Sequence, residues 1–319
     1  MVGFGSMLKI RNFIVGKDEA VWAHIASAAF KDYDDFRSIS VEEVRKMEKA
    51  PTFDPSGMFI AEIDGIPVGI VNAHVDKFRE EKKGFIGWLG VLPEHRRRGV
   101  GRKLAEKAVE SLREREMEIA EASFYSSRKV CIRLFESLGF KLVRSSSFMK
   151  MSLEKIPVNI GENREVAIRK LDVKSEEDII LLNKLGNECF KEHFNFRPNK
   201  IEETRRWLLE NPWFKWQAYF FAQLKGEPVG YIGVGIDEKF NKEKNTLSGW
   251  IDDIGVLKPF RRKGIGTTLM LKGLHEFKNK GMKNALLYVD DENPTKAIKL
   301  YEKIGFKTVK KTLIYQKKL

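Results

Sequence analysis

The sequence has little cysteine and no long apolar run, and each shortage excludes a class of protein. Only two cysteines, Cys131 and Cys189, occur in 319 residues, so a disulfide framework is excluded and a reducing cytoplasm is expected. No run of about 18 apolar residues is present, so no membrane-spanning helix is predicted. The opening residues, MVGFGSMLKI, are too short and too weakly apolar for a secretory signal.

Basic residues, by contrast, are in excess. The formal net charge is +13 at pH 7, with 27 Lys and Arg against 23 Asp and Glu in residues 1–160, and 31 against 22 in residues 161–319. This charge calls for an anionic partner, either nucleic acid or a small phosphorylated molecule in each half. No helix-turn-helix, zinc or aromatic RNA-binding motif occurs, which argues against nucleic acid, and no metal is expected.

One sequence motif occurs twice in the chain. VLPEHRRRGVGRKL begins at Val91, and VLKPFRRKGIGTTL begins at Val256, 165 residues later. Two further pairs match in the same order: FIAEIDGIPVGIV from Phe59 with FFAQLKGEPVGYI from Phe220, and LFESLGFKLV from Leu134 with LYEKIGFKTV from Leu300. Collinear matches over this length indicate a duplicated domain rather than a solenoid repeat. We expect domains at 1–155 and 163–319, joined by the linker EKIPVNIGEN.

Each half shows the same order of predicted elements. In the second half a strand starts at Val166, and two helices follow. A pair of strands around a Lys-Gly-Glu-Pro turn, a strand at Gly249 and a helix after Gly264 come next. A strand at Asn284, a helix at Asn293 and a closing pair of strands end the chain. This order predicts an α/β fold with a mixed sheet in each half.

The repeated phrase places a Gly-rich turn between a strand and a helix. Unpaired backbone N–H groups gather at such a helix start, where the helix dipole is positive, so the turn suits a phosphate. A P-loop needs Gly-Lys-Ser/Thr, which neither copy has, and a dinucleotide fingerprint needs a third glycine where Leu104 and Leu269 stand. The remaining template is Arg/Gln-x-x-Gly-x-Gly/Ala.

That template is matched by Arg96-x-x-Gly99-x-Gly101 and by Arg261-x-x-Gly264-x-Gly266. With it, the sequence resembles the GNAT superfamily of acyl-CoA-dependent N-acetyltransferases, once per half. The second half looks most like tandem GNAT proteins of the mycothiol-synthase type, in which the C-terminal domain is active. The resemblance implies two tandem mixed-sheet acyl-CoA N-acyltransferase domains, with acetyl-CoA as co-substrate. It does not imply mycothiol as the substrate, because pocket residues vary.

The resemblance also implies where acetyl-CoA binds. The strand before the turn splays from its neighbour, and the pantetheine arm pairs with the exposed backbone. The implied contacts in the second half are Ile254, Val256, Arg261, Arg262, Lys263, Gly264, Ile265, Gly266, Thr267 and Asn293. Their counterparts in the first half are Val91, Arg96, Arg97, Arg98, Gly99, Val100 and Gly101. Both turns keep the signature, so both are expected to be able to hold CoA.

The two halves differ where the family places its proton donor. A tyrosine on the last helix protonates the departing thiolate, and the Asn that opens this helix contacts the pantetheine. The second half has Tyr301 and Asn293, whereas the first has Phe135 and Ser127. Phenylalanine cannot donate a proton, so chemistry is expected only in the second half. A core aromatic is the competing interpretation of Tyr301.

A second difference lies in the strand before the turn. Many family members have a glutamate base near the position of Trp250, and this sequence departs from that pattern. Asp252 is our first candidate for the base and Asp253 the second, while binding of a cationic substrate is an equal alternative for both. Alternation predicts that Asp252 shares a face with Trp250 and that Asp253 points to the other. The first half has Gly87 and Trp88 at these places.

The leading hypothesis is therefore an acetyl-CoA-dependent N-acetyltransferase that acts on the primary amine of a small molecule or peptide. The alternative is a non-enzymatic acyl-CoA-binding or regulatory protein. Composition and motifs leave open the acceptor amine, the acyl chain length and the oligomeric state.

Overall fold

The computed structural model describes residues 7–319, and the chain forms two compact units. The first comprises Met1–Arg144 together with Thr312–Leu319, and the second comprises Ser145–Lys311. These units differ from the two sequence repeats, 1–155 and 163–319, because the last strand of each repeat belongs mainly to the other unit.

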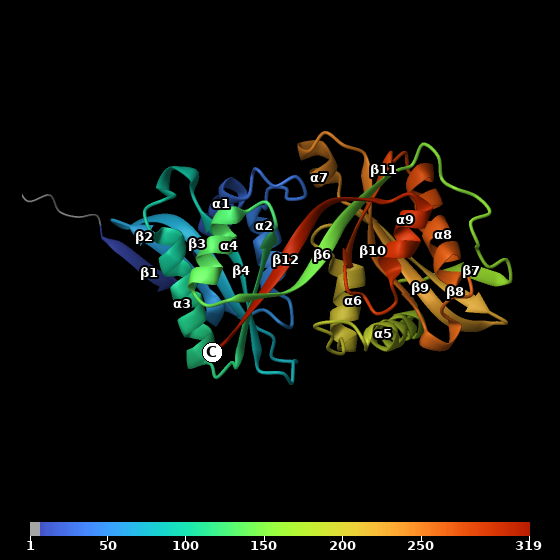
Figure 1. Ribbon diagram of the computed structural model, residues 1–319, viewed down its shortest axis with the longest axis horizontal. Coiled ribbons are helices and arrows are strands. Elements are labelled where there is room, and N and C mark those ends of the chain that lie inside the picture. The colour runs from blue at the N-terminus through green and yellow to red at the C-terminus, as the bar shows by residue number, and fades with distance from the viewer. Residues whose placement is uncertain (1–6) are drawn as a thin grey trace, which may run out of the picture. The chain divides into compact units, whose positions relative to one another are not determined.

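The first unit is a mixed sheet with helices on both faces (Figure 1). Its sheet runs β1-β2-β3-β4-β5-β12, and β4 and β5 are its parallel neighbours. In chain order its elements are β1 (Leu8–Asn12), α1 (Glu19–Ala29), α2 (Val41–Glu48), β2 (Met58–Ile63), β3 (Ile66–Val75), β4 (Lys83–Val91), α3 (Val100–Glu114), β5 (Ile119–Tyr125), α4 (Lys129–Ser137) and the end of β12 (Lys307–Lys318).

The second unit repeats this plan. Its sheet runs β6-β11-β10-β9-β8-β7, and β10 and β11 are parallel. Its elements are the end of β6 (Lys141–Ser152), β7 (Val166–Lys170), α5 (Glu176–Phe190), α6 (Ile201–Glu210), β8 (Trp216–Leu224), β9 (Glu227–Ile236), α7 (Glu238–Glu243), β10 (Ser248–Val256), α8 (Ile265–Asn279), β11 (Asn284–Asp290), α9 (Ala297–Ile304) and the start of β12.

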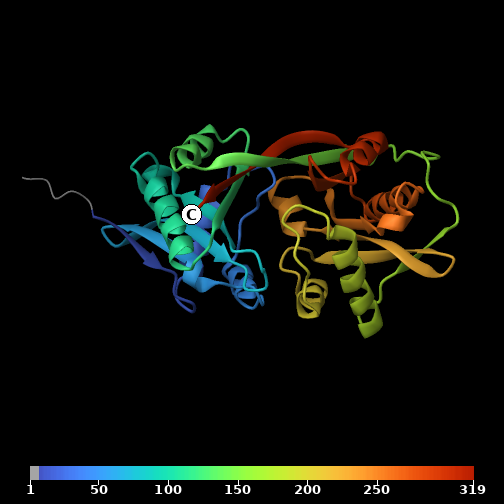
Figure 2. The same ribbon diagram turned by 60° about the horizontal axis from the view of Figure 1, so that its bottom comes forward.

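Two apolar layers flank the sheet of the second unit, and each covers one face. Side chains of α8 and α9 pack on Phe220, Ile232 and Ile251. On the opposite face, α5 and α6 pack on Tyr219 and Tyr231. Alternate residues of β8 and β9 thus point to different layers, as strand geometry requires. In Figure 2, α5 and α8 lie on opposite sides of this sheet.

The last strands of the two repeats are exchanged. Residues 146–152 of β6 pair antiparallel with β11, and residues 312–318 of β12 pair antiparallel with β5. Met149 and Met151 of the first repeat are buried in the core of the second unit, and Tyr315 of the second repeat is buried in the core of the first. The predicted closing pair of strands is a single strand, β12, because its second part leaves for the other unit.

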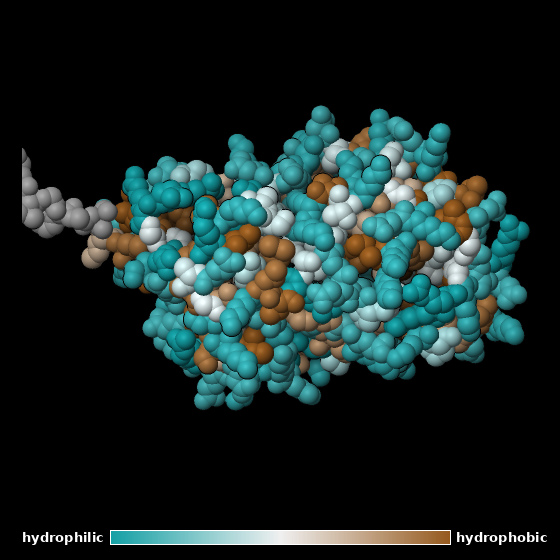
Figure 3. All heavy atoms as spheres, viewed as in Figure 1, coloured by the Kyte–Doolittle hydropathy of each residue, from teal (hydrophilic) through white to brown (hydrophobic). Residues whose placement is uncertain are grey.

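The face of the molecule seen in Figure 3 is largely polar. Figure 3 shows hydrophilic side chains over most of the face in view, with apolar side chains in small groups between them. Among residues 7–319, no helix has the length and apolar character needed to cross a membrane.

Candidate active site

A β-bulge in β10 determines where the two aspartates point. Ile251 pairs with Val234 and Asp253 pairs with Gly233 on β9, so Asp252 is an extra residue between them. The bulge shifts the alternation of the strand by one residue. The carboxylates of Asp252 and Asp253 consequently contact tyrosines of the same layer, whereas Ile254 packs in the opposite layer. The prediction that the two aspartates face opposite sides is wrong for this reason.

Each aspartate accepts hydrogen bonds from an aromatic side chain. Oδ2 of Asp252 accepts from Tyr219 Oη at 2.5 Å and from Trp207 Nε1 at 2.8 Å. Oδ2 of Asp253 accepts from the hydroxyl of Tyr231. The sequence pattern did not identify the two tyrosines as site residues, because it marks Tyr219 and Tyr231 only as members of predicted strands. Their chain spacing gives no sign that both reach the bulge.

Burial raises the pKa of both carboxyls. The pKa of Asp253 is raised to about 7, chiefly by burial and further by the charge of Asp252, while the hydrogen bond from Tyr231 opposes the rise. The pKa of Asp252 is also raised by burial, and the donors Tyr219 and Trp207 hold it down. A carboxyl with a pKa near neutrality can accept a proton from an amine at physiological pH. Both aspartates thus stay candidates for the base, and the pKa of Asp253, raised to about 7, suits that role.

Two cavities of the second unit share these aspartates. The larger has a volume of about 810 Å³ and lies along β10, the turn before α8, β11 and α9. The smaller has a volume of about 370 Å³ and lies against α5 and α6. Asp252 and Asp253 line both cavities. An acyl donor in one cavity and an acceptor in the other would therefore meet at the carboxylates.

The larger cavity opens where β10 and β11 separate. Residues Ser248–Trp250 of β10 pair with Asn284–Leu286 of β11, and the pairing ends there. The residues that follow on both strands line the cavity. The other edge of β10 stays paired with β9 as far as Val256. Backbone groups beyond Trp250 are thus available to an extended ligand, as the resemblance implied.

The glycine turn forms part of the lining of this cavity. Gly264 is the N-cap of α8 with φ of 77°, and Arg262 also has a positive φ, of 64°. Backbone N–H groups at such a turn and at the helix start favour an anion. Of the expected contacts, the cavity is lined by Ile254, Val256, Arg261, Arg262, Gly264, Gly266, Thr267 and Asn293.

Two expected contacts point elsewhere. Ile265 is 1% exposed because its side chain packs in the core under the sheet. Lys263 holds its ammonium over the ring of Phe260, 5.4 Å from the centroid. Neither is among the described residues that line the cavity. The buried side chain of Ile265 leaves only its backbone to a phosphate, whereas Lys263 is exposed at the surface.

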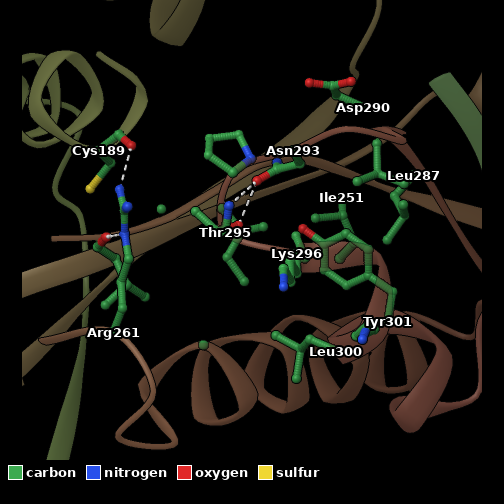
Figure 4. Close-up of a pocket in the computed structure, with 18 of the residues that line it drawn as sticks. Cys189, Ile251, Arg261, Leu287, Asp290, Asn293, Thr295, Lys296, Leu300 and Tyr301 are labelled. Carbon is green, nitrogen blue, oxygen red and sulfur yellow. Dashed lines mark hydrogen bonds between the residues drawn. The ribbon is translucent and has the colours of Figure 1, made fainter. Parts of the chain in front are cut away.

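Arg261 has a structural task in addition to any charge that it offers. Its guanidinium donates to the carbonyl oxygens of Val256 at 3.0 Å and Cys189 at 3.0 Å. Arg96 does the same in the first unit, toward Val91 at 3.1 Å and Ala29 at 3.0 Å. Each arginine thereby connects the end of a strand to the last turn of a helix, α5 for Arg261 and α1 for Arg96. A cation is favourable at the C-terminal end of a helix. Figure 4 shows Arg261 turned toward Cys189.

The linker between the repeats covers the glycine turn of the second unit. Asn163 Nδ2 donates to Lys263 O at 2.8 Å, and the backbone N–H of Asn163 donates to Thr268 Oγ1 at 2.9 Å. A Cβ on Gly264 would lie 2.5 Å from Gly161 O. Gly264 is therefore required by the close approach of the linker as well as by its positive φ. The sequence showed the linker but not this contact.

Tyr301 lines the same cavity as the glycine turn. It is 7% exposed, packs against Phe306 and lines the cavity from α9. Figure 4 shows its ring extending from α9 toward Ile251. Burial, and then the charge of Asp253, raise the pKa of Tyr301, so its hydroxyl stays protonated and can donate.

Asn293 precedes the last helix instead of opening it. Its Oδ1 accepts from the backbone N–H of Thr295 at 2.8 Å and from Thr295 Oγ1 at 2.6 Å, and α9 begins only at Ala297. The predicted helix start at Asn293 is wrong, because this Asx turn and the positive φ of Lys296 form a short loop first. Asn293 nevertheless lines the cavity.

The first unit has a glycine turn with the same backbone geometry. Arg97 and Gly99 have φ of 65° and 81°, which match the second turn, and Arg98 is exposed. Val100 is 1% exposed because, like Ile265, it is buried in a core. A Cβ on Gly101 would meet only Val91, at 3.8 Å. The backbone of this turn thus has the shape of a phosphate site.

Aromatic side chains fill the place of the aspartates in the first unit. Trp88 stands where the second unit has Asp253, and its ring lies 5.9 Å from Phe30 and 6.1 Å from Phe36. Phe135 stands where the second unit has Tyr301, and packs on Phe140. No carboxylate or phenol occupies these two positions.

The fold and the cavity define a class of acyl-transferring proteins, and comparison with known sequences agrees. The chain belongs to the Acetyltransferase (GNAT) family, whose family model matches residues 21–140 and 183–306. The prediction of two tandem domains of this family is thereby confirmed. Among residues 7–319, no cluster of side chains suitable for a metal ion occurs.

The chain is similar in sequence to proteins named mycothiol acetyltransferase. The chain is 34% identical to the mycothiol acetyltransferase of Thermobispora bispora over 42% of its own length and 46% of that relative. It is 25% identical to the mycothiol acetyltransferase of Saccharomonospora viridis over 92% of its length and 97% of the relative. The stronger matches thus span less than half of the relatives' length.

Two solved structures resemble the whole chain. A tandem GNAT protein from the clavulanic acid biosynthesis pathway has a TM-score of 0.73 at 14% identity, over 98% of both chains. A GCN5-related N-acetyltransferase from Sphaerobacter thermophilus has a TM-score of 0.70 at 20% identity, over 98% of this chain and 95% of that one. At these identities the likeness establishes the fold.

Proposed function

We propose that this protein transfers an acetyl group from acetyl-CoA to a primary amine of a small molecule or peptide, with the chemistry in the unit Ser145–Lys311. One observation carries the proposal. In this unit a phosphate-binding turn, a buried phenol and two carboxylates line a single cavity of about 810 Å³. Relatives named mycothiol acetyltransferase support acetyl transfer as the reaction.

The residues present can account for each proton. Asp253, with a pKa of about 7, removes the proton that the amine loses when its nitrogen attacks the thioester carbonyl carbon. The carbon–nitrogen bond forms and the carbon–sulfur bond then breaks. Tyr301 donates a proton to the departing thiolate, and the products are the N-acetylated amine and CoA. Solvent then takes up the proton from Asp253 and supplies a proton to Tyr301, which restores both groups.

The cavity also explains how acetyl-CoA would be held. The turn at Gly264 offers N–H groups to the pyrophosphate, and Gly266 leaves room beside Val256 and Leu300, at 4.0 Å and 3.3 Å from the position of a Cβ. The gap between β10 and β11 accepts the pantetheine as an added strand. In this arrangement the thioester approaches Tyr301 and the aspartates from the turn side.

The test combines binding with turnover. Acetyl-CoA should raise the melting temperature of the full chain, because a ligand at 100 times its Kd adds about 2.7 kcal/mol of stability. A panel of primary amines should then release free CoA thiol at rates that differ strongly from one amine to another. Binding without turnover on any amine would instead support a regulatory acyl-CoA-binding protein. Stabilisation by duplex DNA alone would reject both.

A further inference from the structure

The smaller cavity has walls of a different chemical character from the larger one. It lies between α5, α6 and the face of the sheet that carries the two aspartates. Its lining consists of Leu182, Asn183, Gly186, Asn187, Asn199, Glu203, Thr204, Trp207, Tyr219, Tyr231, Asp252 and Asp253. Amide, hydroxyl and carboxylate groups thus contribute to its surface beside apolar parts, but among residues 7–319 no Lys, Arg or His side chain does.

The two cavities differ in their cationic side chains. Among the described residues that line the smaller cavity, three are acidic (Glu203, Asp252 and Asp253) and none is Lys, Arg or His. The larger cavity shares Asp252 and Asp253 and adds Asp290, but its lining also contains six cations: Lys258, Arg261, Arg262, Lys296, Lys299 and Lys303. An anionic ligand is thus attracted to the larger cavity and repelled from the smaller one.

The negative charge that a ligand meets in the smaller cavity comes chiefly from the aspartates. Glu203 is already paired with Arg197 through two contacts of 2.6 Å, and it also caps the start of α6. Asp252 receives both of its donors on Oδ2, which leaves Oδ1 to accept from an ammonium or amine. The cationic end of a ligand is consequently directed to the junction of the two cavities.

The rest of the wall is held in place by amide contacts. Asn183 Nδ2 donates to Thr204 Oγ1 at 2.9 Å and to Asn199 O at 3.0 Å. Asn187 Oδ1 accepts from the backbone N–H of Asn199 at 2.8 Å. This network joins α5, α6 and the loop between them, so the polar wall is organised before a ligand arrives. Such a wall suits a body with neutral hydrogen-bonding groups.

We propose that the smaller cavity binds the acceptor and selects a small primary amine whose other groups are neutral or cationic, against amines that carry a carboxylate or phosphate nearby. The proposal rests on the proposed acetyl transfer. An added anion would lie close to two carboxylates with no cation in the lining to pair with it. We expect kcat/KM to be at least about tenfold lower for the anionic member of each matched pair of amines.

The test uses pairs that differ by one anionic group. Ethanolamine is compared with O-phosphoethanolamine, glucosamine with glucosamine 6-phosphate, and a dipeptide amide with the free dipeptide, at saturating acetyl-CoA and constant ionic strength. A consistent preference for the neutral member supports the inference. Equal or faster turnover of the anionic members overturns it while leaving acetyl transfer intact.

A charge-changing variant gives the second arm. Thr204→Lys places a cation in the wall and should lower the preference for the neutral member about tenfold or more, with the KM for acetyl-CoA unchanged. Thr204→Gln adds similar length without charge and should leave the preference unchanged. If both variants change the preference for the neutral member equally, shape rather than charge selects the acceptor, and the inference is wrong.

The failure of acetyl transfer itself would be recognised separately. In that case no amine is turned over, and calorimetric titration of the same pairs into the CoA-saturated protein measures the selectivity of the cavity directly. Tighter binding of neutral members would still support the inference. Equal binding within every pair would overturn it.

Discussion

At the scale of single residues, the burial of two neighbouring aspartates in one strand lowers the stability of the folded protein when their carboxyls are charged. Because burial raises the pKa of Asp253 to about 7 from an ordinary value near 4, the folded protein favours the protonated carboxyl. The contribution of this group to stability is therefore fully present below pH 4 and is lost as the pH rises through 7. Such a cost is tolerated where a base of near-neutral pKa is needed.

Asp253→Asn should separate activity from stability. We expect kcat to fall about 10²–10⁴-fold, since the proton acceptor is lost while Asn Oδ1 still accepts from Tyr231. The free energy of unfolding at pH 8 should rise by about 1–3 kcal/mol, with little change near pH 4. Denaturant unfolding at the two pH values measures this. A loss of stability at pH 8 would contradict the assignment.

The wild-type pH profile provides an independent check on the same residue. With Asp253 as base, kcat/KM should rise with pH and reach half of its plateau near pH 7. Asp252→Asn should move this midpoint downward, because the charge of Asp252 raises the pKa of Asp253. A midpoint that stays in place would assign the titration to another group.

Tyr301→Phe should lower turnover and leave acetyl-CoA binding nearly intact. The ring that packs on Phe306 is retained, whereas general acid help, worth about 10²–10⁴-fold, is lost. Steady-state kinetics with both substrates separates kcat from KM. Phe135→Tyr is the matched control and should change neither, because the first unit has Gly87 and Trp88 in place of the carboxylates. A fall of only a few-fold would limit Tyr301 to positioning.

At the scale of elements, the same turn sits in two environments. In the first unit a Cβ on Gly99 meets nothing within 4 Å, whereas on Gly264 it would meet the linker at 2.5 Å. Both glycines have a positive φ, so alanine carries the left-handed strain of about 1–2 kcal/mol in either place. The difference between the two substitutions therefore isolates the contact with the linker.

Gly264→Ala should be the more harmful of the two substitutions. We expect it to displace residues 161–163 and raise the KM for acetyl-CoA, whereas Gly99→Ala should cost only its backbone strain. Melting temperature and KM are measured for both variants. Equal effects on the KM would show that the linker does not shape the cofactor cavity.

At the scale of the whole molecule, exchange of the last strands makes each unit depend on the other repeat. Tyr315 contacts Phe124 and donates to Glu136 in the first unit, and Met149 is fully buried in the second. A fragment that spans only residues 163–319 lacks Met149 and Met151, so it exposes the edge of β11. Substitution in the full chain is the cleaner experiment.

Tyr315→Ala and Met149→Ala should each weaken the unit that receives the strand. Burial of large side chains predicts losses of about 2–5 kcal/mol in both cases. Hydrogen exchange should speed up in β5 for Tyr315→Ala and in β11 for Met149→Ala. Faster exchange in β11 for Tyr315→Ala, with β5 unchanged, would contradict the exchanged arrangement.

The sequence by itself determined the family, the duplication and the asymmetry of the two halves. These depend on local patterns: a strand, a Gly-rich turn and a helix, with Tyr301 against Phe135 at matching positions. Backbone geometry at such a turn follows from a few consecutive residues, so the two similar sequences adopt similar φ values, 81° at Gly99 and 77° at Gly264.

Only the tertiary structure decided how the aspartates, the linker and the last strands are arranged. A single inserted residue in β10 places Asp252 and Asp253 against Tyr219 and Tyr231, because strand alternation is reversed beyond a bulge. The exchange of β6 and β12 leaves no trace in local pattern, since each strand has a similar partner in either unit. Contacts between residues more than 100 positions apart, such as Asn163 with Thr268, depend on the completed fold.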